Sequence, residues 1–343
     1  MMEFLSVLWF FLIFLLIAGY FVLDGFDLGI GTLSPFIAKN DEERAILRRS
    51  IGPVWDGNEV WLLTAGGALF AAFPDAYATT FSGFYLAVML VLFGLIVRAV
   101  SFEFGAGDPH WRKLWDACFF VGSLLPALLL GVAVGNIFAG IPMDAIGDYV
   151  GMPLFGLITP FTLLTGLLGL SMFLAAGASW AALKTPLDSE LRARAIALRM
   201  PLQVVSLVLF VIVSIYALIL IGPDMDANLS VLRILFAVLV VAGLVVAMIV
   251  GKLQDNDLKS FLAQSASMIA LVALLACSMF PVLVNATPDS IGPAITIYNA
   301  ASSELSLACM SIILCIGLPL VLAYHVIIYR TFRGRISAAD LKH

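Results

Sequence analysis

The sequence predicts an all-α integral membrane protein with nine transmembrane helices. Three observations lead to this fold class: the composition, the lengths of the apolar runs and the placement of the basic residues. Of the 343 residues, 62% are hydrophobic and 12% are charged, with a mean hydropathy of +1.08. A soluble domain is about 45–50% apolar and about 25% charged. The composition therefore indicates a protein whose main surroundings are lipid, and no nucleic-acid partner is expected.

The apolar runs have the length and pattern of spanning helices. A helix needs about 20 apolar residues to cross a bilayer. Phe, Leu, Val, Ile and Ala fill the runs without the strict alternation of a barrel strand, which favours helices. The predicted spans are 5–25 (with a helical continuation to 36 left open), 52–73, 80–102, 114–138, 154–181, 201–221, 231–250, 261–284 and 304–329.

The basic residues then predict the orientation, because Lys and Arg favour cytoplasmic loops. With nine spans, 17 of the 18 basic residues fall on one side, and only Arg233 falls on the other. The intervening loops carry acidic residues instead. The N-terminus is therefore expected outside and the C-terminus in the cytoplasm. The chain starts Met-Met-Glu without a basic region, so the first run is expected to be an anchor rather than a cleaved signal peptide.

Four carboxylates lie where the first two predicted helices meet the cytoplasmic boundary. Asp24 and Asp27 end the first run, and Asp56 and Glu59 stand in the first turns of the second. At 1.5 Å per residue, Asp56 should lie ~6 Å and Glu59 ~10 Å inside that boundary. Charged side chains in a membrane segment are costly, rare and usually functional. The pattern predicts a place where protons or ions enter the membrane.

Arg98 and Asp116 extend this group, because they end the third span and begin the fourth at the same side. A proton path needs carboxylates that are partly desolvated and whose charges are balanced nearby. A purely structural alternative stays open: the acids could be helix caps or simple ion-pair partners of Arg98.

A haem iron is ligated mainly by His, Met or Cys, and the twelve methionines of this chain form no ligand pattern. Of the three histidines, His110 is in a predicted loop, His343 is the last residue and His325 alone is in a predicted span. The four cysteines form no Cys-x-x-Cys pair and are best explained as packing residues. No phosphate-binding loop, dinucleotide motif or metal triad is present. We expect no cofactor to be ligated by this chain.

Three strings carry a more specific signal: VLDGFDLGIG at 22–31, PVWDGNEVWL at 53–62 and TAGGALFAAFP at 64–74. They closely resemble subunit II of cytochrome bd quinol oxidase. The match continues at 81–85, at Arg98, at 111–112 with 115–116, at 131–133 with 135–136, at 301–303 with Leu305, and at 332–336. The resemblance spans nearly the whole chain and is densest in the first 140 residues.

The resemblance implies a single membrane domain, 1–343, built as two four-helix bundles plus one peripheral helix. The first bundle would be 5–138, which holds the acids of the proton path, the second would be 154–284, and the peripheral ninth helix would be 304–329. It implies a homologous subunit I that holds the haems, two b-type and one d-type, and the quinol site. The complex, in a prokaryotic plasma membrane, would oxidise quinol, reduce dioxygen to water and take its protons from the cytoplasm. This chain would scaffold subunit I and line proton uptake without ligating haem.

The resemblance also implies roles for residues and partners. Asp56 matches the position associated with the cytoplasmic entrance of a proton channel, whereas Glu59 matches a position where Gln also occurs, which weakens its candidacy. Trp61 matches a position near a proposed oxygen route. Some members hold a structural quinone in this subunit, and lipids and small single-helix subunits are further expected partners. A stand-alone proton- or cation-coupled transporter is the alternative function, since it too would explain acids in the membrane.

Overall fold

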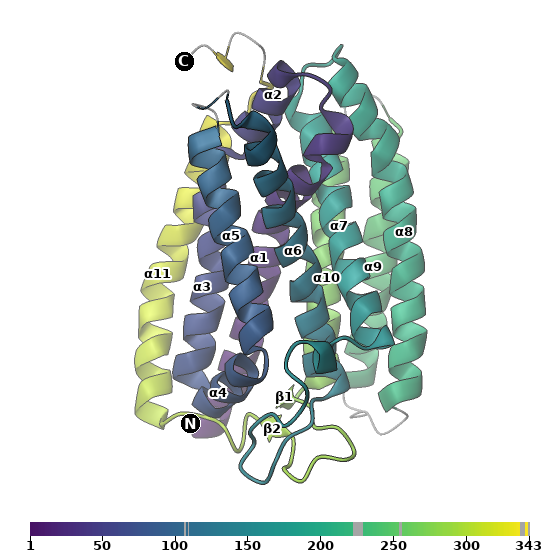
Figure 1. Cartoon of the computed structure of the whole chain (residues 1–343). Helices are drawn as coiled ribbons and strands as arrows, with labels where there is room; N and C mark the ends of the chain where they lie inside the picture. Colours follow the sequence, from purple (N-terminus) through teal and green to yellow (C-terminus); the bar gives the residue numbers. More distant parts are fainter. Residues whose placement is uncertain (106–107, 109, 222–228, 254–255, 337–339, 342–343) are drawn as a thin grey trace.

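Long helices lie side by side and connect the two ends of the molecule in the computed structural model, which describes residues 1–105, 108, 110–221, 229–253, 256–336 and 340–341 (Figure 1). The helices are α1 (Met2–Ile37), α2 (Asp41–Ile51), α3 (Trp55–Ala72), α4 (Pro74–Gly83), α5 (Tyr85–Gly105), α6 (Arg112–Ala139), η1 (Phe155–Leu157), α7 (Pro160–Lys184), α8 (Glu190–Ile221), α9 (Ser230–Gly251), α10 (Asp257–Met279) and α11 (Glu304–Thr331). Strands β1 (Val282–Val284) and β2 (Ile295–Thr296) pair antiparallel.

Eight helices of the described chain are long and apolar enough to cross a membrane: α1, α5, α6, α7, α8, α9, α10 and α11. The predicted class of a helical membrane protein is therefore confirmed. The predicted span 52–73 corresponds to α3, which lies between α5 and α11 in Figure 1. Asp56, Asn58 and Glu59 in its first turns lower its hydropathy below that of the other eight. Nine spans stay a prediction.

Several predicted boundaries differ from the observed ones. The continuation of the first span to residue 36 is present, since α1 is one helix of 36 residues. The span predicted at 201–221 starts earlier, because the polar turns from Glu190 onward belong to the same helix α8. The span predicted at 261–284 is helical only to Met279 and then continues as strand β1 after Pro281. An apolar run alone does not separate a helix from a following strand.

Helix α1 is the central helix of the molecule and packs against α3, α6, α7 and α10. Its contact with α7 is very close: a Cβ atom added to Gly29 would lie 2.0 Å from the carbonyl oxygen of Phe173. Small residues permit such close approach of membrane helices. Helices α7, α8, α9 and α10 each pack on the next, and α7 also packs on α10. The division into two four-helix bundles stays a prediction.

The two ends of the molecule differ in charge. The N-terminus lies at the end with α4 and the two strands, and helix α11 ends at the opposite end, where α2 lies (Figure 1). We call the latter the basic end, because it carries the ion-paired arginines of α2, the start of α6 and the start of α8: Arg44, Arg48, Arg112, Arg192 and Arg194.

Helix α11 forms an edge of the molecule (Figure 1) and packs against α1 and α3. The segment after it is fastened to the basic ends of α7 and α10. Arg335 donates to the carbonyl oxygens of Ala182 at 2.9 Å and Thr185 at 2.7 Å, and to Asp257 at 3.3 Å. Asp257 also accepts hydrogen bonds from two arginines of α8. The buried Asp257 therefore ties the C-terminal segment to the rest of the fold.

Candidate functional site

A buried polar cluster lies between α1, α3 and α5, towards the basic end. Asp24 on α1 is 0% exposed and Arg98 on α5 is 2% exposed. Nη2 of Arg98 donates to Oδ1 of Asp24 at 2.9 Å and to Oε2 of Glu59, on α3, at 3.3 Å. The buried cluster consists of the buried residues Tyr20, Asp24, Asp27, Asn58 and Arg98 together with the half-buried Glu59.

Asp27 is held differently from Asp24, because an amide and not a guanidinium binds it. Its Oδ2 accepts a hydrogen bond from Nδ2 of Asn58 at 2.8 Å, and the same Nδ2 donates to the carbonyl oxygen of Leu23 at 3.0 Å. Oδ1 of Asn58 accepts from the hydroxyl of Tyr329, on α11, at 3.1 Å. The sequence pointed to neither Asn58 nor Tyr329. Asn58 gave a signal as a polar residue inside an apolar run, whereas Tyr329 gave none.

The buried cluster has hydrogen-bonding capacity that its own side chains do not use. The atoms concerned are Tyr20 Oη, Asp24 Oδ2, Asp27 Oδ1, and Nε and Nη1 of Arg98. An unused buried donor or acceptor costs ~1–3 kcal/mol, so proteins usually avoid it. In addition, three carboxyl groups surround one guanidinium, and a buried charge needs a partner. Such a cluster can accept and release further protons.

Two of the predicted proton-path residues lie outside the buried cluster. Asp56 is exposed at the start of α3, where its Oδ1 accepts a hydrogen bond from the backbone N–H of Gly57 at 2.8 Å. Asp116, at the start of α6, pairs with Arg48 at 2.8 Å and Arg44 at 3.4 Å. The expected convergence of acids at one end is therefore split into a buried cluster and a surface ion-pair group.

The predicted site residues that the structure does bring together are Asp24, Asp27, Glu59 and Arg98. The pairing with Arg98 that the sequence left open is present for Asp24 and Glu59. Asp27 makes no ion pair with Arg98 in this arrangement, so the pairing alternative does not account for its burial.

Trp61 and His325 connect α3 with α11. Trp61 Nε1 donates to His325 Nε2 at 3.2 Å, and His325 Nδ1 lies 2.8 Å from the carbonyl oxygen of Val321. Because Nε2 accepts, the ring proton is on Nδ1 and both nitrogens are engaged. His325 therefore does not fit the role of an axial haem ligand. Within the described residues, no group of three or more His, Cys, Asp or Glu is placed to hold a metal ion.

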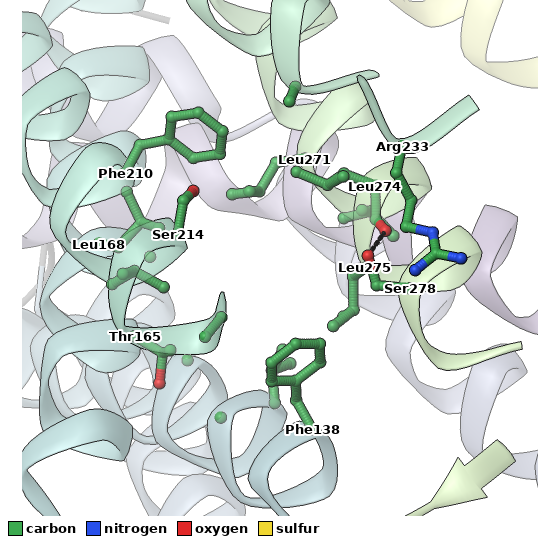
Figure 2. A pocket seen from close by; sticks show the side chains of 18 of the residues that line it. Phe138, Thr165, Leu168, Phe210, Ser214, Arg233, Leu271, Leu274, Leu275 and Ser278 are labelled. Atoms are coloured by element: carbon green, nitrogen blue, oxygen red, sulfur yellow. Dashed lines mark hydrogen bonds between the residues drawn. The ribbon is translucent and has the colours of Figure 1, made fainter. Parts of the chain in front are cut away.

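A second feature is an apolar cavity of about 420 Å³ among α6, α7, α8, α9 and α10. Figure 2 shows Phe210 and Leu168 on one side of it and Leu271 and Leu275 on the other. The few polar groups at its wall include Thr165, Ser214, Ser278 and the guanidinium of Arg233. The cavity has the apolar lining and sparse polar groups typical of sites for small lipophilic molecules. The sequence did not point to it.

The chain is similar to members of one protein family. Residues 5–332 match the family described as cytochrome bd terminal oxidase subunit II. The chain is 34% identical over 373 residues to cytochrome bd-I ubiquinol oxidase subunit 2 of Escherichia coli (strain K12), covering 99% of this chain and 97% of that protein. It is 35% identical over 346 residues to cytochrome bd ubiquinol oxidase subunit 2 of Bacillus subtilis (strain 168), covering 98% of each. A chain of the bd oxidase from Geobacillus thermodenitrificans shares the fold, with a TM-score of 0.80 at 18% identity over 96% of this chain and 98% of that chain.

Proposed function

The chain belongs to the cytochrome bd terminal oxidase subunit II family, and from this premise we propose that it is the haem-free subunit of a bd-type quinol oxidase, scaffolds subunit I and lines proton uptake. Membership makes it part of a membrane-bound oxidoreductase complex of a bacterial respiratory chain, with a subunit I partner and haems in the complex. The haems, two b-type and one d-type, would be held by subunit I. A haem-bearing subunit that co-purifies with the tagged chain would separate this proposal from the stand-alone transporter.

The buried cluster is the observation that supports the proton role. Reduction of dioxygen to water consumes four protons and four electrons per oxygen molecule, and the chemistry takes place in subunit I. In this chain, Arg98 and Asp24 form a fixed ion pair, while Oδ1 of Asp27 is buried without a partner and can take up a proton. Glu59 binds Arg98 through Oε2. Exposed Asp56, three residues before Glu59 on α3, would collect protons at the basic end.

The proposal includes the orientation of the chain. The basic end would face the cytoplasm and the N-terminus the outside, because basic residues concentrate on cytoplasmic loops. Helix α3 would be the ninth span. Its polar turns lie at the basic end, so its apolar remainder would face the membrane interior. With that orientation, the protons of the reaction would be drawn from the cytoplasm and the reaction would build a proton gradient.

Asp56→Asn tests the entrance. We expect several-fold slower oxygen consumption by the assembled complex with normal haem content, because an exposed carboxylate raises the local proton concentration while its removal breaks no tertiary contact. Oxygen consumption with excess quinol and charge movement in proteoliposomes measure this. The matched control is Asp75→Asn, an exposed aspartate in the first turn of α4 at the opposite end. Wild-type turnover and charge movement in Asp56→Asn would remove Asp56 from the path.

We also propose that the apolar cavity holds the structural quinone or a lipid chain expected for this subunit. Its volume and apolar walls suit an isoprenoid or acyl chain. Ala217→Phe, which places a ring in the wall, is expected to lower the quinone or lipid recovered by solvent extraction of the purified complex at least several-fold. Ala323→Phe, on the exposed face of α11, is the control. Equal recovery from both variants would contradict this assignment.

Trp61 would lie beside an oxygen route, where its buried ring is held between α1 and α11. A Cβ atom added to Gly19 would lie 2.3 Å from that ring, so the absence of a side chain at Gly19 of α1 makes room for the Trp61 ring. Small single-helix subunits would be further partners, and lipid-facing α11 offers an apolar surface of the kind that they need.

A further inference from the structure

Helix α11 makes unusually specific contacts for a helix at the edge of the molecule. Most of its apolar side chains are exposed, but in the half nearer the basic end of the molecule it carries aromatic rings that contact α3. A Cβ atom added to Gly57 would lie 3.1 Å from the ring of Tyr324. One turn along, Tyr329 donates to Asn58. Both contacts are made with the first turn of α3, at Gly57 and Asn58, and Asn58 belongs to the buried cluster.

The orientation of the Asn58 amide follows from its neighbours. The carbonyl oxygen of Leu23 can only accept a hydrogen bond, so the amide NH₂ of Asn58 must face it. The same NH₂ then donates to Oδ2 of Asp27, and the amide oxygen is left to accept from the hydroxyl of Tyr329. The three hydrogen bonds are mutually consistent in this arrangement and in no other. Tyr329 therefore fixes the amide whose NH₂ holds Asp27.

The two carboxylate oxygens of Asp27 therefore differ in their hydrogen bonding. Oδ2 is bound by Asn58, whereas Oδ1 is buried with no partner. A proton taken up by this carboxyl group would sit on Oδ1, because Oδ2 already accepts. A neutral amide cannot pass a proton from Tyr329 to Asp27, since its NH₂ donates without exchanging. Asn58 and Tyr329 therefore hold the carboxyl group rather than relay protons to it.

We propose that helix α11 contributes to proton uptake through Tyr329. Tyr329 is a positioning residue: it orients Asn58, which in turn holds Asp27 so that Oδ1 can accept the proton. This inference rests on the proposed function of the buried cluster. The charged and titratable groups around Asp27 are Asp24 of α1, Glu59 of α3, Arg98 of α5 and Tyr329 of α11, and Tyr20 of α1 lies beside Asp24. Of these, Tyr329 alone comes from outside the helices that make the buried cluster.

Tyr329→Phe in the assembled oxidase tests the inference, because it removes the hydroxyl and keeps the ring. We expect turnover to fall roughly tenfold, since misplacing a reacting group by ~1 Å costs up to ~100-fold. Haem content and the KM for quinol should be unchanged. The solvent deuterium isotope effect on turnover should rise, and its pH profile should change, because proton transfer becomes rate-limiting. Tyr324→Phe is the matched control, since Tyr324 also lies on α11 against α3 but its hydroxyl is outside the hydrogen-bonded series.

A double variant separates positioning from simple packing. Asn58→Ser should reproduce the slower turnover and the larger isotope effect, and adding Tyr329→Phe should slow it no further, because Tyr329 acts through Asn58. Additive losses, or a wild-type isotope effect in both single variants, would overturn the inference. Wild-type behaviour of Tyr329→Phe beside a slow Asp27→Asn would overturn it while leaving the proposed function intact. Wild-type turnover in Asp27→Asn would remove Asp27 from proton uptake, and with it the part of the proposed function on which this inference rests.

Discussion

Replacing Arg98 with leucine is expected to prevent stable folding and assembly of the chain. Arg98 is 2% exposed and is the guanidinium that pairs with Asp24 and Glu59. Removing one partner of a buried ion pair costs ~3–5 kcal/mol, because the remaining charge stays buried without compensation. That loss is a large share of a typical net stability of ~5–15 kcal/mol. The amount of chain in the membrane and the haem content of the purified complex measure the effect.

The fold offers a matched control for Arg98→Leu. Arg112 on α6 pairs with Asp41 on α2, but side-chain exposures of 48% and 57% place this pair at the surface. Exposed pairs contribute ~0–1 kcal/mol, so Arg112→Leu should assemble normally. Combining Arg98→Leu with Asp24→Asn should recover part of the loss, since it removes one uncompensated carboxylate. Normal assembly of Arg98→Leu alone would show that this pair does not stabilise the fold.

The composition and the apolar runs predicted the fold class well, because transfer into lipid depends mainly on side-chain hydropathy. Polar segments outside the apolar runs were predicted less well. Helix α2 lies in what was expected to be a loop, although its signals were present in the sequence: Asn40 caps it by accepting from the backbone N–H of Glu43 at 2.9 Å, and Arg48 and Arg49 are in its last turn. Such short polar helices give no hydropathy signal.

The same helix explains why Asp116 lies apart from the buried cluster. Arg44 and Arg48 are four residues apart on α2, so they share a face, and both reach Asp116. Depth along the membrane normal placed Asp116 near Arg98, but depth does not specify the direction around a helix. The pairing of Asp24 with Arg98 could be anticipated from depth and charge. The contact of Tyr329 with Asn58 could not, because only the packing of α11 on α3 brings them together.

The buried cluster predicts its largest functional effect at Asp27. Asp27→Asn should slow oxygen consumption by the assembled complex by about 100-fold, the lower end of the ~10²–10⁴-fold contribution of a positioned acid or base. Asparagine has the same shape, and its side-chain oxygen can still accept the hydrogen bond from Asn58, but it cannot carry a proton. Assembly and haem content should be normal. Oxygen consumption with excess quinol and proton uptake by proteoliposomes are the measurements.

Asp116→Asn is the matched control for Asp27→Asn, because it neutralises an aspartate at the same end of the molecule that lies outside the buried cluster. It should retain nearly wild-type turnover. Asp24→Asn should behave differently from both, since it breaks the ion pair with Arg98 and therefore lowers stability before it affects turnover. If Asp27→Asn turns over as fast as Asp116→Asn, the buried carboxyl group takes no part in proton uptake, and its burial beside Asn58 would reflect helix packing alone.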